Sequence, residues 1–202
     1  MTFLEELKEQ RWDDHRFYHH SRINQSLHLV SALSFLVTYA LLLFTHHAVF
    51  AVLFGWTFSM CIRQVGHFFF EPKGYDDMNQ ATHEYKERIK VGFNLRRKVI
   101  LHAVWGIAPL LLVVEPSLFG LLPPHTSVGG YLEDLARVWI VIAGAALGGR
   151  TVQLCFTRGV QTGLAWFTKI LTDPFHDVLM YWRAPAALMR GELIQPPHER
   201  TA

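Results

Sequence analysis

Four long runs of apolar residues dominate the chain and are separated by short or strongly polar segments. They cover residues 27–44, 48–70, 99–114 and 135–156. A membrane-spanning helix needs about 20 mostly apolar residues, and only helices or closed barrels satisfy the backbone in lipid. The pattern therefore predicts an all-α polytopic membrane protein. Its four transmembrane helices would form one hairpin over 27–70 and a second over 99–156.

The segments outside these runs are amphipathic or charged. Residues 2–12 place apolar and charged side chains at helical spacing, and residues 159–194 mix Trp, Phe and Tyr with Lys and Arg. Both segments are too polar to span and are typical of helices that lie in the membrane interface. We expect two such helices in the tail. The second should begin at Asp173-Pro174, because proline is favoured at the first helical position.

The whole chain, residues 1–202, is expected to form a single membrane domain. Its parts are an interfacial segment (1–26), a transmembrane hairpin (27–70), a cytoplasmic loop (71–98), a second hairpin (99–156) and an interfacial tail (157–202). Within the last hairpin, Gly144 and Gly148 form a small-xxx-small pair, which predicts a close helix contact there.

The charges indicate how the spans are oriented. Half of the residues are hydrophobic and the net charge is only +2, which gives no sign of a nucleic-acid partner. Lys and Arg occur throughout 1–26, 71–98 and 157–202, whereas 45–47 and 115–134 contain none. By the positive-inside rule, both termini and the 71–98 loop are cytoplasmic, in a bacterial inner membrane or the endoplasmic reticulum. The two cysteines, Cys61 and Cys155, support neither a disulfide framework nor a cysteine-rich zinc site.

Several histidines fall at the predicted cytoplasmic ends of the spans. His28, His67 and His102 each lie at such an end of a different helix. Glu71 follows His67 by one helical turn, so that an imidazole and a carboxylate share a face. Imidazole and carboxylate ligands at a common depth favour a non-haem iron site, with zinc as the second choice.

Helical spacing alone leaves the choice of further ligands open. His20, Asn24 and His28 are four residues apart, which favours His20 over His19 as the partner of His28 if the helix already begins there. His102 has no carboxylate at helical spacing, so packing or substrate contact is an equal alternative to ligation. His176 is followed directly by Asp177, which is the pattern either of a ligand with its orienting carboxylate or of a surface pair.

Two arginines interrupt the apolar runs. Arg63 and Arg150 lie near the cytoplasmic ends of the second and fourth spans. Ionisable groups at this depth are costly and are often functional. We expect them either to bind the anionic head group of a substrate or to extend to the membrane surface.

Two motifs resemble the Mpo-like family, the fungal and plant 2-hydroxy fatty acid dioxygenases. The first is Tyr18-His19 followed by Asn24 and His28, with the spacing Tyr-His-x4-Asn-x3-His. The second is the stretch Gln64-x-Gly66-His67-x2-Phe70-Glu71. The resemblance covers about residues 15–80. The chain departs from the family pattern at Ser21-Arg22 and at residues 73–77.

The resemblance implies a haem-independent, Fe(II)-dependent membrane enzyme. Such an enzyme uses O₂ to shorten a 2-hydroxy fatty acid by one carbon in fatty acid α-oxidation, so that its partners are O₂, a lipid acyl substrate and the membrane. The resemblance also favours His19 over His20 as the ligand beside His28 and His67. Glu71 and Asn24 are then the expected catalytic residues.

Two other functions fit the same pattern of residues. A b-type membrane cytochrome would use His28 and His67, on antiparallel helices, as axial haem ligands. A non-enzymatic lipid-binding membrane protein would hold no metal, and its function would not depend on His67.

Overall fold

The computed structural model describes residues 1–71 and 73–195, so residues 196–202 of the predicted tail lie outside the described part. Its longer helices are α1 (Phe3–Tyr18), α2 (Arg22–Phe44), a continuous helix from Ala48 to Phe70, α6 (Leu95–Val114), α7 (Val128–Arg158) and α8 (Val160–Tyr181). Two short helices, α5 (His83–Ile89) and α9 (Ala184–Met189), complete them. The prediction of an all-α chain with four helices long and apolar enough to cross a membrane is confirmed by α2, the 48–70 helix, α6 and α7.

Polar caps explain why three of these helices begin before their apolar runs. The side chains of Ser21, Asn94 and Ser127 each accept a hydrogen bond from the backbone N–H three residues later. Such a cap satisfies one of the free donors of the first turn and favours the helix start. The polar residues ahead of each run are therefore included in the helix.

The helix from Ala48 to Phe70 alternates between α-helical and wider π-helical turns. Its segments are α3 (Ala48–Phe54), η1 (Gly55–Met60), α4 (Cys61–Val65) and η2 (Gly66–Phe70). Each π-helical segment begins at a glycine that lies against α2. A Cβ atom on Gly55 would lie 3.0 Å from Thr38 Cγ2, and one on Gly66 would overlap Asn24 Oδ1. The glycines thus let the two helices approach closely, and π-helical turns of this kind change the direction of the side chains that follow.

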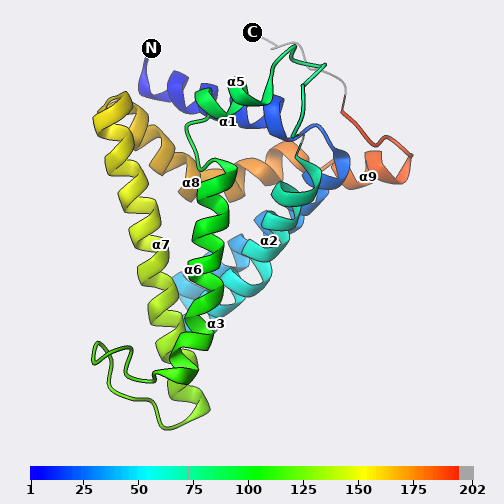
Figure 1. Cartoon of the computed structure of the whole chain (residues 1–202). Coiled ribbons are helices and arrows are strands. Elements are labelled where there is room, and N and C mark those ends of the chain that lie inside the picture. Colours follow the sequence, from blue (N-terminus) through cyan, green and yellow to red (C-terminus); the bar gives the residue numbers. More distant parts are fainter. Residues whose placement is uncertain (72, 196–202) are drawn as a thin grey trace.

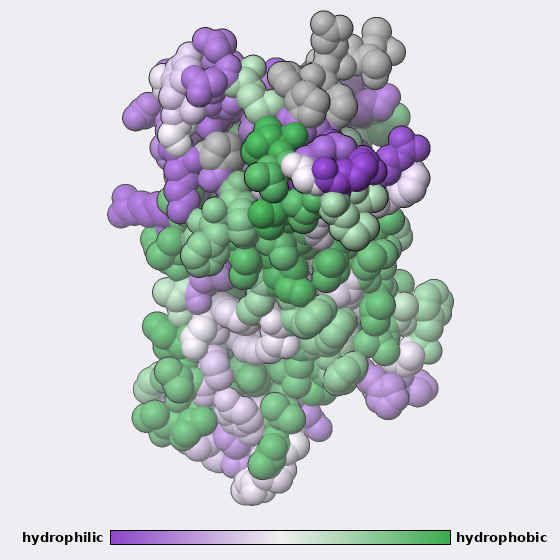
Figure 2. Space-filling model, turned by 90° about the vertical axis from the view of Figure 1, so that its right-hand side faces the viewer, coloured by the Kyte–Doolittle hydropathy of each residue, from purple (hydrophilic) through white to green (hydrophobic). Residues whose placement is uncertain are grey.

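The polar helices gather at one end of the molecule. Figure 1 shows α1 and α5 at the end opposite the loop that joins α6 to α7, with α8 lying across the ends of the long helices. Figure 2 shows a broad hydrophobic belt between this hydrophilic end and the more mixed opposite end. Below α8, Ala108, Leu112, Leu135 and Trp139 form the buried core between α6 and α7.

The tail differs from its prediction. Asp173-Pro174 does not begin a helix, because both residues lie inside α8, and the next helix begins only at Ala184. Proline inside a helix removes a hydrogen bond and displaces the preceding carbonyls. One of these, Leu171 O, accepts a hydrogen bond from Tyr39 Oη at 3.2 Å. The packing of α8 on α1, α2 and α7 therefore prevails over the local preference of proline.

The close contact predicted at Gly144 and Gly148 is wrong for contacts within the described chain. Outside the adjoining residues and the backbone of α7 itself, no described atom lies within 4 Å of a Cβ atom placed on either residue. The close approach of α7 occurs instead where α8 crosses it. A Cβ atom on Gly163 would overlap Cys155 Sγ and lie 2.9 Å from Thr151 O.

Candidate metal centre

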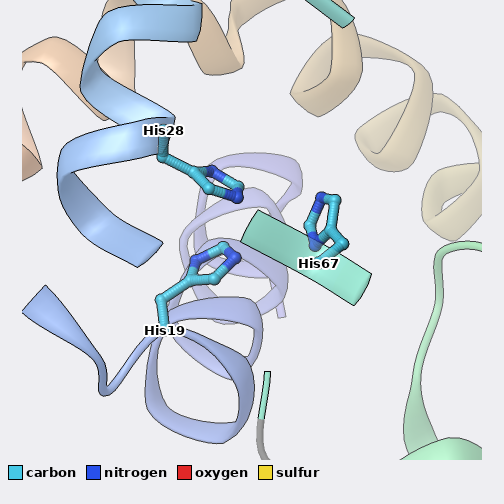
Figure 3. A group of neighbouring side chains, drawn as sticks. All are labelled: His19, His28 and His67. Atoms are coloured by element: carbon cyan, nitrogen blue, oxygen red, sulfur yellow. The ribbon is translucent and has the colours of Figure 1, made fainter. Parts of the chain in front are cut away.

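Three histidines from separate segments converge on one point (Figure 3). His19 lies between α1 and α2, His28 lies on α2, and His67 lies on η2. One possible ligand atom from each lies within 4.8 Å of the others. Two imidazole nitrogens bound to a common ion at about 2.1 Å are at most about 4.2 Å apart. Small side-chain rotations are therefore enough to bring all three to ligand distance.

An oxygen atom lies near Nδ1 of each of these imidazoles, and it forms a hydrogen bond in two of the three. His19 Nδ1 lies 2.9 Å from Tyr181 Oη, and His28 Nδ1 lies 3.5 Å from Asp177 Oδ2. His67 Nδ1 forms a short hydrogen bond with Glu71 Oε1. Histidines that bind a metal commonly donate their other ring N–H to such a carboxylate or hydroxyl.

Several ring nitrogens of the cluster are buried without a hydrogen-bond partner, among them Nδ1 of His28. Nε2 of His19 and Nε2 of His28 are buried and have no hydrogen-bond partner among the described residues. A buried polar atom without a partner carries a free-energy cost that a ligand at that position removes. The donor set therefore fits a metal ion held by three imidazole nitrogens.

Side-chain amides and the tail fix the backbone that carries His19. Asn24 Nδ2 donates to Tyr18 O at 3.1 Å, and Gln25 Nε2 donates to His19 O at 2.7 Å. On the other side, the backbone N–H of Gln195 donates to His20 O at 2.8 Å. These bonds indicate that Asn24, which we expected to be catalytic, holds the turn that presents His19.

The structure brings His19, and not His20, to the other two histidines. His20 Nε2 lies 3.4 Å from Asp76 Oδ2, on the other side of the turn. The helical spacing that favoured His20 does not apply, because α2 begins only at Arg22 and Ser21 has an extended conformation. The ligand choice suggested by the resemblance agrees with this geometry.

One face of α8 supplies the groups behind the histidines. Lys169, Asp173, Asp177 and Tyr181 are four residues apart and all are buried. Arg63 Nη2 lies 2.8 Å from Asp177 Oδ2 and 3.9 Å from Asp173 Oδ2. Sequence reasoning treated this segment as an interfacial tail and missed Tyr181. The four-residue spacing of its polar side chains was the signal that could have revealed the inward face.

Burial favours the neutral imidazole of His19, and neighbouring cations favour the ionised carboxylate of Asp177. Burial, with smaller effects from His28 and His67, lowers the pKa of His19 well below its usual value. Burial alone would raise the pKa of Asp177, but the charge of Arg63 and the contact with His28 outweigh it and hold that pKa below its usual range. Metal binding requires neutral imidazoles, and an ionised carboxylate behind one of them supports it.

A cavity of about 290 Å³ leads from the histidines into the membrane-spanning region. His19, His67 and charged side chains line one part of it. The other part is lined by apolar and aromatic side chains from three of the long helices, including Phe35, Met60 and Trp105. The lining therefore combines charged side chains with apolar and aromatic ones, which is the chemistry of a site for an amphipathic ligand.

The remaining predicted site residues have different positions. His102 and His176 both line this cavity but lie outside the histidine cluster. His102 Nδ1 donates to Lys98 O at 2.6 Å. Arg63 lines the cavity and is bound to Asp177, whereas Arg150 is absent from its described lining. Arg150 Nη2 donates to Val91 O at 2.6 Å, so this guanidinium anchors the loop before α6 to α7.

Comparison of the chain with protein-family models, with curated proteins and with solved structures found no match. The resemblance to the Mpo-like family therefore depends on the two motifs that carry His19, His28 and His67.

Proposed function

We propose that the protein is a membrane-bound non-haem Fe(II) dioxygenase that shortens 2-hydroxy fatty acids by one carbon. The observation that carries this proposal is the convergence of three imidazoles whose ligand atoms lie within 4.8 Å of one another and whose Nδ1 atoms each lie near an oxygen atom of Tyr181, Asp177 or Glu71. The amphipathic cavity beside them supports a lipid as the substrate.

The residues of the chain have distinct parts in this proposal. His19, His28 and His67 would hold the ion, and Tyr181, Asp177 and Glu71 orient them through Nδ1. When bound, Fe(II) supplies open positions for O₂ and for the oxygens of a 2-hydroxy carboxylate. The apolar walls hold the acyl chain and exclude water from the reacting end of the substrate. The reaction balances without a reductant, because 2-hydroxy acid and O₂ yield the acid one carbon shorter, CO₂ and water.

The geometry favours a compact ion over haem. Axial imidazoles lie on opposite faces of a porphyrin. The ring centroids of His28 and His67 are only 4.8 Å apart, their planes are perpendicular, and His19 lies within 6 Å of both. This spacing supports a single ion between the three rings. Three histidines also suit zinc, so the metal has to be identified on the purified protein.

The proposal places the histidine centre at the cytoplasmic surface of the membrane. The distribution of Lys and Arg supports cytoplasmic termini, with α1, α8 and α9 in the interface. Two cysteine variants, His46→Cys and Asp77→Cys, test this in a background in which Cys61 and Cys155 are serine. A membrane-impermeant thiol reagent should label the two positions from opposite sides. Labelling from the same side would contradict the four-span topology.

Oxygen uptake tests the activity directly. Protein loaded with Fe(II) in lipid nanodiscs should consume O₂ with 2-hydroxypalmitate and release a product one carbon shorter, detected by mass spectrometry. Palmitate, which lacks the 2-hydroxyl group, is the matched substrate control and should not support uptake. Equal rates with both acids, or no uptake with either, would contradict the proposed reaction.

A further inference from the structure

The charged side chains of the cavity are unevenly paired. Among the described lining residues, five are Lys or Arg and four are Asp or Glu. Lys169 Nζ lies between two carboxylates, those of Asp14 and Asp173. Arg63 likewise faces both Asp173 and Asp177. Arg11 also pairs with Asp173, at 3.8 Å, so these three cations face the three carboxylates of Asp14, Asp173 and Asp177.

Lys90 and Lys98, in contrast, share one carboxylate. Lys98 Nζ lies 3.5 Å from Glu71 Oε1, and Lys90 Nζ lies 3.9 Å from Glu71 Oε2. No other carboxylate of the described residues forms an ion pair with either lysine. The side chain of Lys90 is only 7% exposed, and that of Lys98 is only 12% exposed. The carboxylate of Asp14 also attracts both ammonium groups, without a direct ion pair. Two ammonium groups that are shielded from water and share one direct carboxylate partner favour the binding of another anion.

The position of this lysine pair connects it to the metal centre. The Glu71 oxygen that faces Lys98 is the same oxygen that binds His67 Nδ1. An anion on Lys98 therefore lies close to a proposed metal ligand. Lys90 is held in place from the other side, because its Nζ lies 3.4 Å from the centroid of the Tyr18 ring, in cation–π contact.

Lys98 also begins a face of α6 that follows the cavity into its apolar part. Leu101, His102 and Trp105 come three, four and seven residues after Lys98, and all line the same cavity. Positions with this spacing share one side of a helix. A ligand whose charged end lies at Lys98 can therefore extend its apolar tail along α6 towards Trp105.

We propose that Lys90 and Lys98 bind the carboxylate of a single-chain fatty acid whose tail occupies the apolar part of the cavity. This inference rests on the proposed function and deepens it, because it names the part of the substrate that the chain recognises. Glu71 contacts both Lys98 and His67, so a carboxylate at Lys98 lies beside the residue that orients a proposed metal ligand. The lysine pair, and not Arg63 or Arg150, is then the head-group receptor.

Equilibrium binding to the metal-free protein tests this without turnover. Radiolabelled 2-hydroxypalmitate is titrated onto protein in nanodiscs, and excess unlabelled acid, its methyl ester or lysophosphatidic acid competes. Lys98→Gln and Lys90→Gln should each weaken binding of the acid by about 10-fold or more, since a hydrogen bond to a charged group is lost. Lys98→Arg, which keeps the charge, should restore most of it. Lys73→Gln, which removes an exposed lysine of the preceding loop, should leave binding unchanged.

The wild-type protein provides a test that does not depend on the folding of a variant. The acid should compete at least about 10-fold better than its uncharged methyl ester. Equal competition by acid and ester, or equal loss of binding in Lys98→Gln and Lys73→Gln, would overturn the inference. Stronger competition by lysophosphatidic acid would show that the lysine pair prefers a phosphate head group to a carboxylate, and would also overturn the inference.

The two proposals fail in different ways. Charge-dependent binding of the acid without any O₂ uptake would contradict the dioxygenase and leave the lysine receptor intact. Iron-dependent turnover with an unchanged KM in Lys98→Gln would contradict the receptor and leave the dioxygenase intact.

Discussion

Two histidine–aspartate pairs lie at opposite ends of the molecule and differ in what surrounds them. At one end, His28 Nδ1 lies 3.5 Å from Asp177 Oδ2. At the other, His125 Nδ1 lies 3.4 Å from Asp134 Oδ2. The pairs are nearly identical in distance, yet His28 faces two further imidazoles whereas the ring of His125 packs against Tyr131. A histidine with an orienting carboxylate is therefore not enough to indicate a metal site. Convergence of several imidazoles distinguishes one pair from the other.

The arginines that pair with the two aspartates differ in how exposed their side chains are. Asp134 pairs with Arg137, whose side chain is 60% exposed. Asp177 pairs with Arg63, which is only 15% exposed and lines the cavity. A surface ion pair contributes little to stability, whereas a shielded pair is strongly coupled to its surroundings. Substitutions in the His28 pair should accordingly have much larger effects than their counterparts in the His125 pair.

The largest expected difference is between His28→Ala and His125→Ala. His28→Ala removes one of three proposed ligands and should weaken metal binding by more than about 100-fold, beyond the 10–100-fold typical of changes behind a ligand. His125→Ala should leave metal affinity unchanged. Competition with a chromophoric chelator measures both. Equal metal affinity in the two variants would contradict a metal site at His28.

A methyl group added beside each pair tests how tightly each end is packed. A Cβ atom on Gly66 would overlap Asn24 Oδ1 and lie 3.3 Å from His28 Cδ2, whereas one on Gly130 would lie 3.2 Å from His125 Cβ. Gly66→Ala should destabilise the protein by about 1–3 kcal/mol, as overpacking typically does. Gly130→Ala requires only a small shift and should cost less than about 1 kcal/mol. Thermal unfolding in detergent measures both, and a larger loss in Gly130→Ala would contradict the packing described for α2.

Replacing each aspartate by asparagine separates charge from shape. Asp177→Asn removes the carboxylate behind His28 and should lower metal affinity by about 10–100-fold. Asp134→Asn, the matched change at the other end, should have no effect on metal affinity. Isothermal titration with Fe(II) under anaerobic conditions gives both values. An unchanged affinity in Asp177→Asn would reduce Asp177 to a partner of Arg63 alone.

The smallest effect is expected for Tyr181→Phe. This change removes the hydroxyl that lies 2.9 Å from His19 Nδ1 and 3.2 Å from His15 Nδ1. Loss of one neutral hydrogen bond corresponds to about 1 kcal/mol, or roughly a 5-fold lower metal affinity. Tyr131→Phe is the control at the opposite end, since its hydroxyl donates to Pro109 O and does not contact His125 Nδ1. The two variants should differ in metal affinity. Their unfolding temperatures, measured without iron, should be the same.

The apolar pattern predicted the four long helices. The depth of their ends placed His28, His67 and His102 at one level, but only the first two belong to the cluster. His28 and His67 lie at the same end of a hairpin with a short turn, so the sequence required them to be close in depth. The position of His19 depends on two contacts. Ser21 caps α2, so that the helix begins only at Arg22, and the backbone of Gln195, from the other end of the chain, binds His20 O. That tertiary contact has no local signal.

The contribution of α8 was not predicted, because its composition resembles an interfacial helix. Pro174 suggested a helix start, and the aromatic residues suggested an orientation along the membrane surface. The packing of α8 against α1 and α2 keeps the helix continuous through the proline and turns Asp177 and Tyr181 inward. Arg150 shows the converse case, since its position in an apolar run suggested a ligand site and its guanidinium binds backbone carbonyls.

Metal analysis of the purified protein, combined with its absorption spectrum, tests the central claim most directly. The account predicts about one equivalent of iron per chain after anaerobic loading, no Soret band, and loss of the iron in His67→Ala but not in His125→Ala. Stoichiometric haem, or iron retained in full by His67→Ala, would contradict the proposal that His19, His28 and His67 hold the ion.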